Sequence, residues 1–239
     1  MSPKRGAAFL LLSLASTAVF LAYARPDLQL GLPRITRGPG GDRLIALTFD
    51  DAPHPLTTPL LLKALAWTKT RATFFVVGRN VERYPDLAAR IVAGGHEIAS
   101  HSYSHPRLQF LPRAAAAAGL DRADAILRRL TGRSPRFFRP PGGGFSTGVL
   151  ALAASRHYTV ALWSNNPGDY LIPTADGIVT RVLRKLRPGE VVLLHDAGPQ
   201  TAEALTRILP EARSRGYRFV TLSELVDGRA DASPNRPGR

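Results

Sequence analysis

Short apolar runs alternate along this chain with longer segments in which apolar residues recur at helical spacing. The apolar runs predict strands over 43–49, 72–77, 96–99, 136–139, 158–163, 190–194 and 218–221. The segments between them predict helices over 57–69, 80–94, 112–131, 146–156, 174–186 and 199–215, with a further short helix over 222–227. Strand followed by helix, repeated in this way, predicts an α/β fold with a parallel sheet and helical crossovers.

The pattern alone leaves two arrangements of that sheet open, an open doubly wound sheet and a closed barrel. In both arrangements, functional residues collect at the carboxyl ends of the strands. The residues that directly follow each predicted strand are therefore the candidates for a functional site.

The regions outside this repeat differ from it in composition. Lys4 and Arg5 precede an uncharged stretch over 6–24 that ends in a small-x-small pattern, so residues 1–24 are predicted to be a signal peptide or a retained membrane anchor. Residues 25–42 hold three Pro and four Gly and are predicted to be a linker, and residues 227–239 a flexible tail. The folded domain is expected over 43–226, in a protein that is secreted or membrane-anchored and acts outside the cytoplasm.

Charge and cysteine content narrow the possible partners. The chain carries 32 Lys and Arg against 18 Asp and Glu, a net charge of +14. Such a surface is attracted to anionic wall polymers or to a membrane surface, whereas scattered basic residues without a motif predict no specific nucleic-acid binding. Because the chain has no cysteine, any metal must be bound by His, Asp or Glu.

Two polar clusters at strand ends suggest a metal site. Asp50 and Asp51 directly follow the first predicted strand, and His101 and His105 follow the third. Imidazoles four residues apart lie on the same face of a helical turn and could bind one metal ion, with Asp51 as a third ligand. Two His and one carboxylate leave coordination positions open, as in catalytic zinc sites, and a divalent ion would offset the repulsion between the two acids.

Three more clusters follow later strands. They are Arg139-Pro140-Pro141-Gly142-Gly143, the segment WSNNPGDY over 163–170, and Leu193-Leu194-His195-Asp196. Each one alone is also typical of a turn or of a local hydrogen bond. All five clusters together, in this order over residues 43–225, resemble the polysaccharide deacetylases of carbohydrate esterase family 4, also called the NodB homology domain.

The resemblance implies a fold and an activity. It implies a distorted, TIM-barrel-like (β/α) barrel of about seven parallel strands. It also implies one divalent metal, with zinc expected and cobalt or nickel as alternatives, and removal of N-acetyl groups from N-acetylglucosamine in peptidoglycan or a chitin-like chain. Two alternatives stay open: an esterase that removes O-acetyl groups from polysaccharide, and a non-catalytic carbohydrate-binding module on the same fold.

The resemblance also assigns roles to individual residues. It implies Asp50 as catalytic base, Asp51, His101 and His105 as metal ligands, Arg139 as the partner that orients the base, His195 as catalytic acid, Asp169 as the residue that tunes this acid, and Leu193 as part of the acetyl pocket. Three positions depart from the family pattern: Ala52 replaces Gly, Gly142 replaces an aromatic residue, and Tyr170 replaces Trp. Gly142 and Tyr170 are expected to contact substrate, so these departures affect substrate choice and leave the catalytic side chains in place.

Overall fold

The computed structural model describes residues 34–40, 42–172 and 174–228. The predicted signal peptide or anchor, residues 25–33 of the predicted linker and most of the predicted tail lie outside these residues. Within the described part of the chain, no helix has the length and apolar character needed to cross a bilayer.

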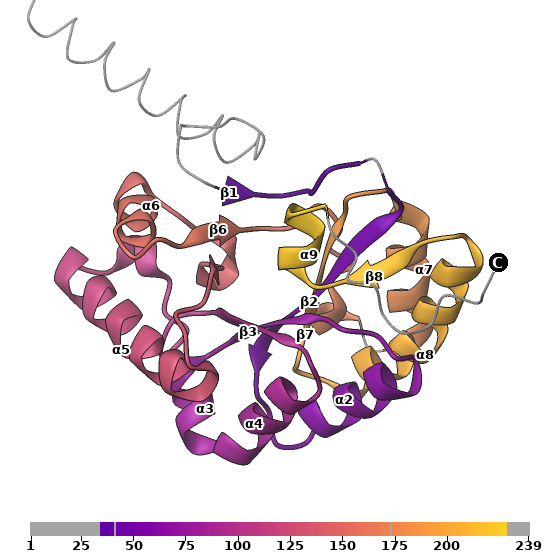
Figure 1. Ribbon diagram of the computed structural model, residues 1–239, viewed down its shortest axis with the longest axis horizontal. Coiled ribbons are helices and arrows are strands. Elements are labelled where there is room, and N and C mark those ends of the chain that lie inside the picture. Colours follow the sequence, from indigo (N-terminus) through magenta and orange to yellow (C-terminus); the bar gives the residue numbers. More distant parts are fainter. Residues whose placement is uncertain (1–33, 41, 173, 229–239) are drawn as a thin grey trace, which may run out of the picture.

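The described strands form one parallel sheet that curves into a distorted barrel (Figure 1). They are β1 (Arg34–Ile35), β2 (Leu44–Ala52), β3 (Thr73–Val76), β4 (Glu97–Ser100), β5 (Phe137–Phe138), β6 (Thr159–Ala161), β7 (Val191–His195) and β8 (Arg218–Val220). Their order is β1-β6-β5-β4-β3-β2-β7, with β8 also paired to β2. A bridge between Asn165 and Val192 joins the chain after β6 to β7. The α/β barrel predicted from the sequence is therefore confirmed.

Helices follow the strands, and most of them cover the outside of the barrel. They are α2 (Thr58–Trp67), α3 (Gly78–Arg83), α4 (Pro85–Ala93), α5 (Arg113–Thr131), α6 (Thr147–Ala154), α7 (Ala175–Lys185), α8 (Pro199–Ser214) and α9 (Leu222–Val226). Short 3₁₀ turns occupy three of the loops after strands: η1 (Leu108–Phe110), η2 (Pro141–Gly143) and η3 (Asp169–Leu171).

Two local expectations differ from the structure. The single helix predicted over 80–94 is two helices, because Pro85 lacks an N–H and disfavours helical geometry at Tyr84, where φ is −131°. Inside the predicted linker, Arg34–Ile35 form β1, which pairs in parallel with Val160 and Ala161 of β6.

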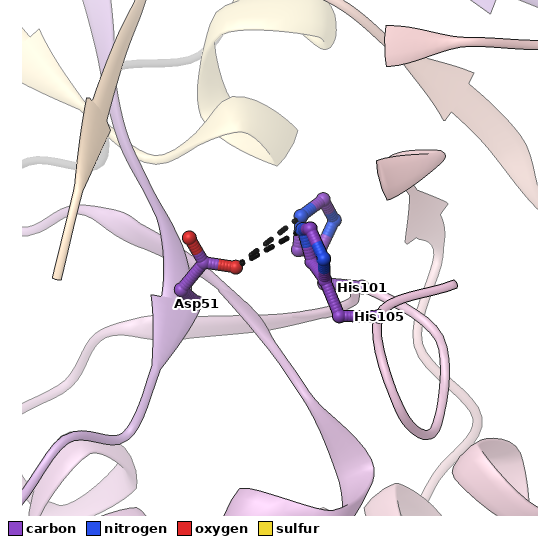
Figure 2. Close-up of side chains that lie close together, drawn as sticks. All are labelled: Asp51, His101 and His105. Atoms are coloured by element: carbon purple, nitrogen blue, oxygen red, sulfur yellow. Dashed lines mark ion pairs between the residues drawn. The ribbon is translucent and has the colours of Figure 1, made fainter. Parts of the chain in front are cut away.

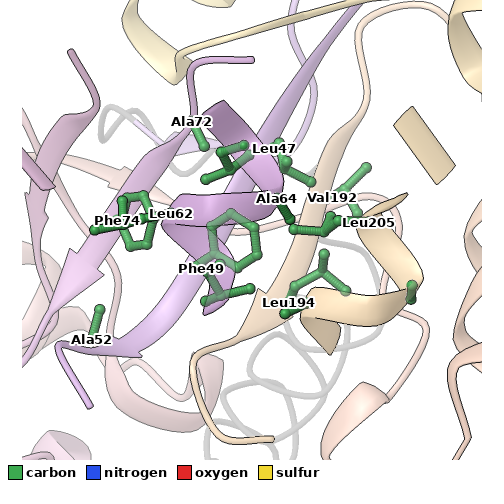
Figure 3. Close-up of a cluster of buried hydrophobic side chains, with 14 of the residues drawn as sticks. Leu47, Phe49, Ala52, Leu62, Ala64, Ala72, Phe74, Val192, Leu194 and Leu205 are labelled. Carbon is green, nitrogen blue, oxygen red and sulfur yellow. The ribbon is translucent and has the colours of Figure 1, made fainter. Parts of the chain in front are cut away.

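The sheet separates the hydrophobic core into a layer outside the barrel and a layer inside it. Leu47 and Phe49 of β2 point outward and pack with α2 and α8, as Figure 3 shows. The alternate residues point into the barrel, where Ala46 packs with Leu222 and Leu225 of α9. Because side chains alternate along a strand, the polar residues that continue the inward series gather at the carboxyl end of the barrel.

Candidate active site

Inward-facing polar residues from neighbouring strands meet at the carboxyl end of the barrel. Asp50 of β2 is paired in register with His195 of β7. Arg139, which directly follows β5, reaches across the interior and donates to Thr48 and Asp50. The strands thus bring the predicted base, its partner and the predicted acid to one place.

Asp50 and Asp51 both face this place because the strand is irregular between them. On a regular strand, adjacent side chains point to opposite faces of the sheet. Asp51 has a φ of 71°, and the register with β3 shifts between Asp50 and Ala52, as in a β-bulge. Asn80 donates to the backbone carbonyl of Asp51 (3.0 Å) and supports this conformation. The bulge turns Asp51 to the same side as Asp50.

His101 and His105 come together through a loop after β4, and the helical turn predicted for them is wrong. Ser102 and His105 have left-handed φ values of 67° and 61°, which no α-helix contains. The N–H of His105 donates to the hydroxyl of Ser102 (3.1 Å), which closes the loop. The two imidazole rings lie 4.9 Å apart between centroids.

Asp51, His101 and His105 form a group of side chains that could bind a metal ion (Figure 2). One Asp51 oxygen lies 3.7 Å from Nε2 of His101 and 3.3 Å from Nε2 of His105. One possible ligand atom from each residue lies within 4.8 Å of the other two. These three donors are an N, N, O set of the kind that zinc accepts in catalytic sites.

The protonation state of His101 fits this use. Its Nδ1–H donates to the backbone carbonyl of Arg139 (2.8 Å), so Nε2 carries the lone pair that faces the carboxylates. Burial lowers the pKa of His101 and outweighs the opposing effects of Asp50 and Asp51. The imidazole is therefore neutral at neutral pH, which is the form that binds a metal.

Arg139 is fully buried and fixes Asp50. Its guanidinium donates to Asp50 at 2.6 Å and to the backbone carbonyls of Ala161 and Leu162 at 3.0 and 2.9 Å, and it lies over the ring of Phe75. Burial acts to raise the pKa of Asp50, but the charge of Arg139, with smaller effects of histidines, outweighs burial and holds this pKa below its usual value. Asp50 is therefore an ionised carboxylate.

His195 is oriented by the buried carboxylate of Asp169. Asp169 accepts from Nδ1 and from the backbone N–H of His195, both at 2.8 Å, and from the hydroxyl of Thr201 at 3.0 Å. Burial acts to lower the pKa of His195, but the hydrogen bond and charge of Asp169 outweigh it and raise this pKa. Tyr170 packs edge-on against His195, with ring centroids 4.9 Å apart.

The other two predicted substrate-contacting residues lie at the same end of the barrel. Leu193 is buried on β7, in register with Thr48 and on the same face as His195. Gly142 is exposed in η2 with a φ of 66°, and a Cβ placed there would meet nothing within 4 Å. The wall that an aromatic residue would form at this position is therefore open.

No role was predicted for Asp196, although it adjoins His195. This buried carboxylate accepts from the hydroxyls of Thr57 and Thr58 and from the N–H of His54 (3.3 Å). It therefore ties the loop after β2, the strand that carries Asp50 and Asp51, to the end of β7. The only sequence feature that could have indicated a role for Asp196 is its position next to a histidine at the end of a strand. Its hydrogen-bond partners come from a distant segment and are visible only in the fold.

Comparisons with known proteins agree with this geometry. Residues 37–161 match the family model described as polysaccharide deacetylase. The chain is 37% identical over 193 residues to a peptidoglycan-N-acetylglucosamine deacetylase of Bacillus cereus, covering 79% of this chain and 90% of that protein. It is 36% identical over 200 residues to a chitooligosaccharide deacetylase of Bradyrhizobium, covering 77% and 91%.

A solved structure shows the same fold. The crystal structure of the Bc1960 peptidoglycan N-acetylglucosamine deacetylase superposes with a TM-score of 0.80 at 34% identity, covering 82% of this chain and 94% of that one. The extent of these matches, with the five motifs assembled at one end of the barrel, shows that the chain belongs to the polysaccharide deacetylase family of hydrolases.

Proposed function

We propose that this protein is a metal-dependent hydrolase that removes N-acetyl groups from N-acetylglucosamine units of peptidoglycan or a chitin-like polysaccharide. One observation carries the proposal. One Asp51 oxygen faces two imidazole nitrogens, at 3.3 and 3.7 Å, while the adjacent Asp50 is held ionised by Arg139. The names of the relatives, which cover peptidoglycan and chitooligosaccharide deacetylation, support the substrate class.

Asp51, His101 and His105 would bind one divalent ion, and we propose zinc. Imidazole nitrogen and carboxylate oxygen suit zinc, and also cobalt and nickel, better than they suit magnesium or calcium. Such an ion, when bound, supplies a Lewis acid next to the acetyl carbonyl and the attacking water.

Asp50 acts as general base in this proposal. As the water oxygen forms its bond to the acetyl carbon, the Asp50 carboxylate accepts a proton from the water. Arg139 contributes by keeping Asp50 ionised and by fixing its orientation through the 2.6 Å contact.

His195 acts as general acid. It donates its proton to the sugar nitrogen as the carbon–nitrogen bond breaks, which gives acetate and a free amino sugar. The carboxylate of Asp169 raises the pKa of His195 and so keeps the protonated form available. Leu193 is positioned to contact the acetyl methyl group from the barrel interior, and Tyr170 to border the site beside His195.

The assay for this function is acetate release from N-acetylglucosamine oligosaccharides and peptidoglycan fragments, with zinc, cobalt or a chelator. Asp50→Asn preserves shape but removes the base, and we expect a loss of about 10²–10⁴-fold in kcat. Asp86→Asn, an exposed carboxylate of α4, is the matched control and should keep full activity. A folded, metal-loaded protein that releases no acetate from any of these substrates would refute the proposal.

Elemental analysis tests the metal site without a choice of substrate. We expect about one divalent ion per chain in the wild-type protein and loss of that ion in Asp51→Asn. The esterase alternative has its own test. If His195→Ala keeps activity on O-acetylated polysaccharide and the wild-type protein ignores acetamides, the bond cleaved is an ester.

We further propose that the protein acts outside the cytoplasm, secreted or anchored through residues 1–24. The basic residues before an uncharged, apolar stretch support this location. Cell fractionation with N-terminal sequencing of the recovered protein tests it. Recovery of the intact chain in the cytoplasmic fraction alone would refute it.

A further inference from the structure

A basic cleft of about 600 Å³ lies between α2 and α4, at the opposite end of β3 and β4 from the catalytic residues. Its lining carries Lys63, Lys69 and Arg90, beside His96, and also Arg71, whose guanidinium is paired with Glu224. The described lining includes no carboxylate, and the remaining wall is largely apolar, with Leu62, Leu65, Ala66 and Ala93. A cavity of this size suits a small organic ligand, and its lining suits one that is anionic and partly apolar.

Neither Lys63 nor Lys69 is required by the local structure of α2 or of the turn that follows it. Lys63 is exposed in the middle of α2, away from the carbonyl groups at the helix end. Lys69 has a φ of 49°, a conformation in which Gly or Asn is favoured after a helix. Burial and the charge of Arg71 lower the pKa of His96 to about 4, so this imidazole stays neutral in a positive surrounding.

An exposed tryptophan follows the cleft-lining Lys63 along α2. Trp67 is 68% exposed and lies one turn after Lys63 on the same face of α2. Tryptophan beside lysine is typical of protein surfaces that lie at the boundary between lipid and water. A soluble polyanion would be attracted by the charges but would gain less from the exposed indole and the apolar wall.

We propose that this cleft docks the protein on an anionic bilayer, with the phosphodiester head group of a lipid bound between α2 and α4. The catalytic residues stand at the other end of the barrel, so docking leaves the mouth of the active site open to a polysaccharide. This interaction is separate from the proposed deacetylation, because the cleft lies at the opposite end of β3 and β4 from the catalytic side chains.

Vesicle partitioning of the full-length protein tests the docking. We compare phosphatidylcholine vesicles with and without phosphatidylglycerol, because the ratio of the two partition constants removes any lipid binding that does not depend on charge. Lys63→Gln with Lys69→Gln should lower this ratio about 30-fold. Arg113→Gln with Arg129→Gln removes two exposed charges of α5 and is the matched control. Trp67 emission should shift to the blue only when phosphatidylglycerol is present.

Each outcome decides the proposal. A ratio that falls in the cleft variant and stays unchanged in the control supports it. An equal fall in both variants means general attraction by net charge, and no fall in either means that the cleft is not involved; both overturn it. Binding of soluble polyglycerol phosphate, but not vesicles, through Lys63 and Lys69 would assign the cleft to a polymer instead.

Two controls distinguish vesicle docking from other causes of the emission change and from the proposed deacetylation. The chain has two tryptophans, so Trp67→Phe leaves only Trp163 and identifies the source of the emission change. Acetate release from soluble oligosaccharides should be unchanged in every cleft variant. Failure of docking therefore leaves the proposed activity intact, and failure of that activity leaves vesicle binding intact.

Discussion

Replacement of Arg139 by glutamine should destabilise the protein by about 3–5 kcal/mol at neutral pH. The guanidinium is fully buried and donates to Asp50, Thr48 and the carbonyls of Ala161 and Leu162. Its loss leaves the charged Asp50 carboxylate buried without its guanidinium partner, which costs about 3–5 kcal/mol. Because domains are commonly stable by about 5–15 kcal/mol, the variant should fold but unfold much more easily.

The pH dependence of this loss has a definite sign. In the wild-type protein the pKa of Asp50 lies below its usual value, so ionisation of Asp50 stabilises the fold above that usual value and the benefit is lost as pH falls. Without Arg139, burial raises the pKa of Asp50, and ionisation then opposes folding as pH rises. The difference in unfolding free energy between wild type and variant should therefore be smallest in acid.

The assay is urea unfolding of wild type, Arg139→Gln, Asp50→Asn and the double variant, each with the same chelator. At neutral pH the double variant should be more stable than Arg139→Gln, because the unpaired charge is gone. At about pH 4 that difference should shrink. A double variant that loses the full sum of the two single losses would refute the reasoning, as would an Arg139→Gln protein with wild-type stability.

Two further predictions concern the acid and the loop after β5. Asp169→Asn removes the charge that raises the pKa of His195, so the alkaline limb of kcat/KM for N-deacetylation should move to lower pH; an unmoved limb would show that another group is the acid. Gly143→Ala places a Cβ 2.4 Å from the ring of Trp163, whereas Gly142→Ala has the same positive φ and open space. Thermal unfolding should therefore show Gly143→Ala less stable than Gly142→Ala by about 1–3 kcal/mol, and equal stabilities would contradict the packing described.

Much of the fold was predictable because the barrel repeats one local pattern. Each buried strand is a short apolar run, and each covering helix has an apolar stripe, so both periods are visible in the sequence. What could not be read in this way depends on pairing between distant segments. Two residues, Arg34 and Ile35, make a strand only because β6 offers a free edge. The break at Pro85 was readable from the residue itself, since proline disfavours helix at the position before it.

The three candidate metal ligands do come together in the structure, but not through the local conformation that their spacing predicted. Four-residue spacing predicted a helical turn for His101 and His105, whereas a loop with left-handed residues brings them together. The sequence shows which possible metal ligands are close along the chain, whereas the backbone conformation that brings their side chains together is visible only in the fold. The contact from His101 to the carbonyl of Arg139 shows the same limit, because it joins residues 38 positions apart.

The two adjacent acids of β2 show how one strand end provides two chemical environments. A regular strand would send Asp51 to the opposite face from Asp50, and only the bulge at Asp51 places both carboxylates in the site. Their partners then differ. The side chain of Asp50 is 5% exposed and is paired with Arg139, whereas that of Asp51 is 35% exposed and faces two imidazole nitrogens. The guanidinium of Arg139 therefore offsets the charge of Asp50, while Asp51 belongs to a donor set that fits a cation. Two identical side chains thus have different environments, which is how one site can hold acids with separate proposed roles.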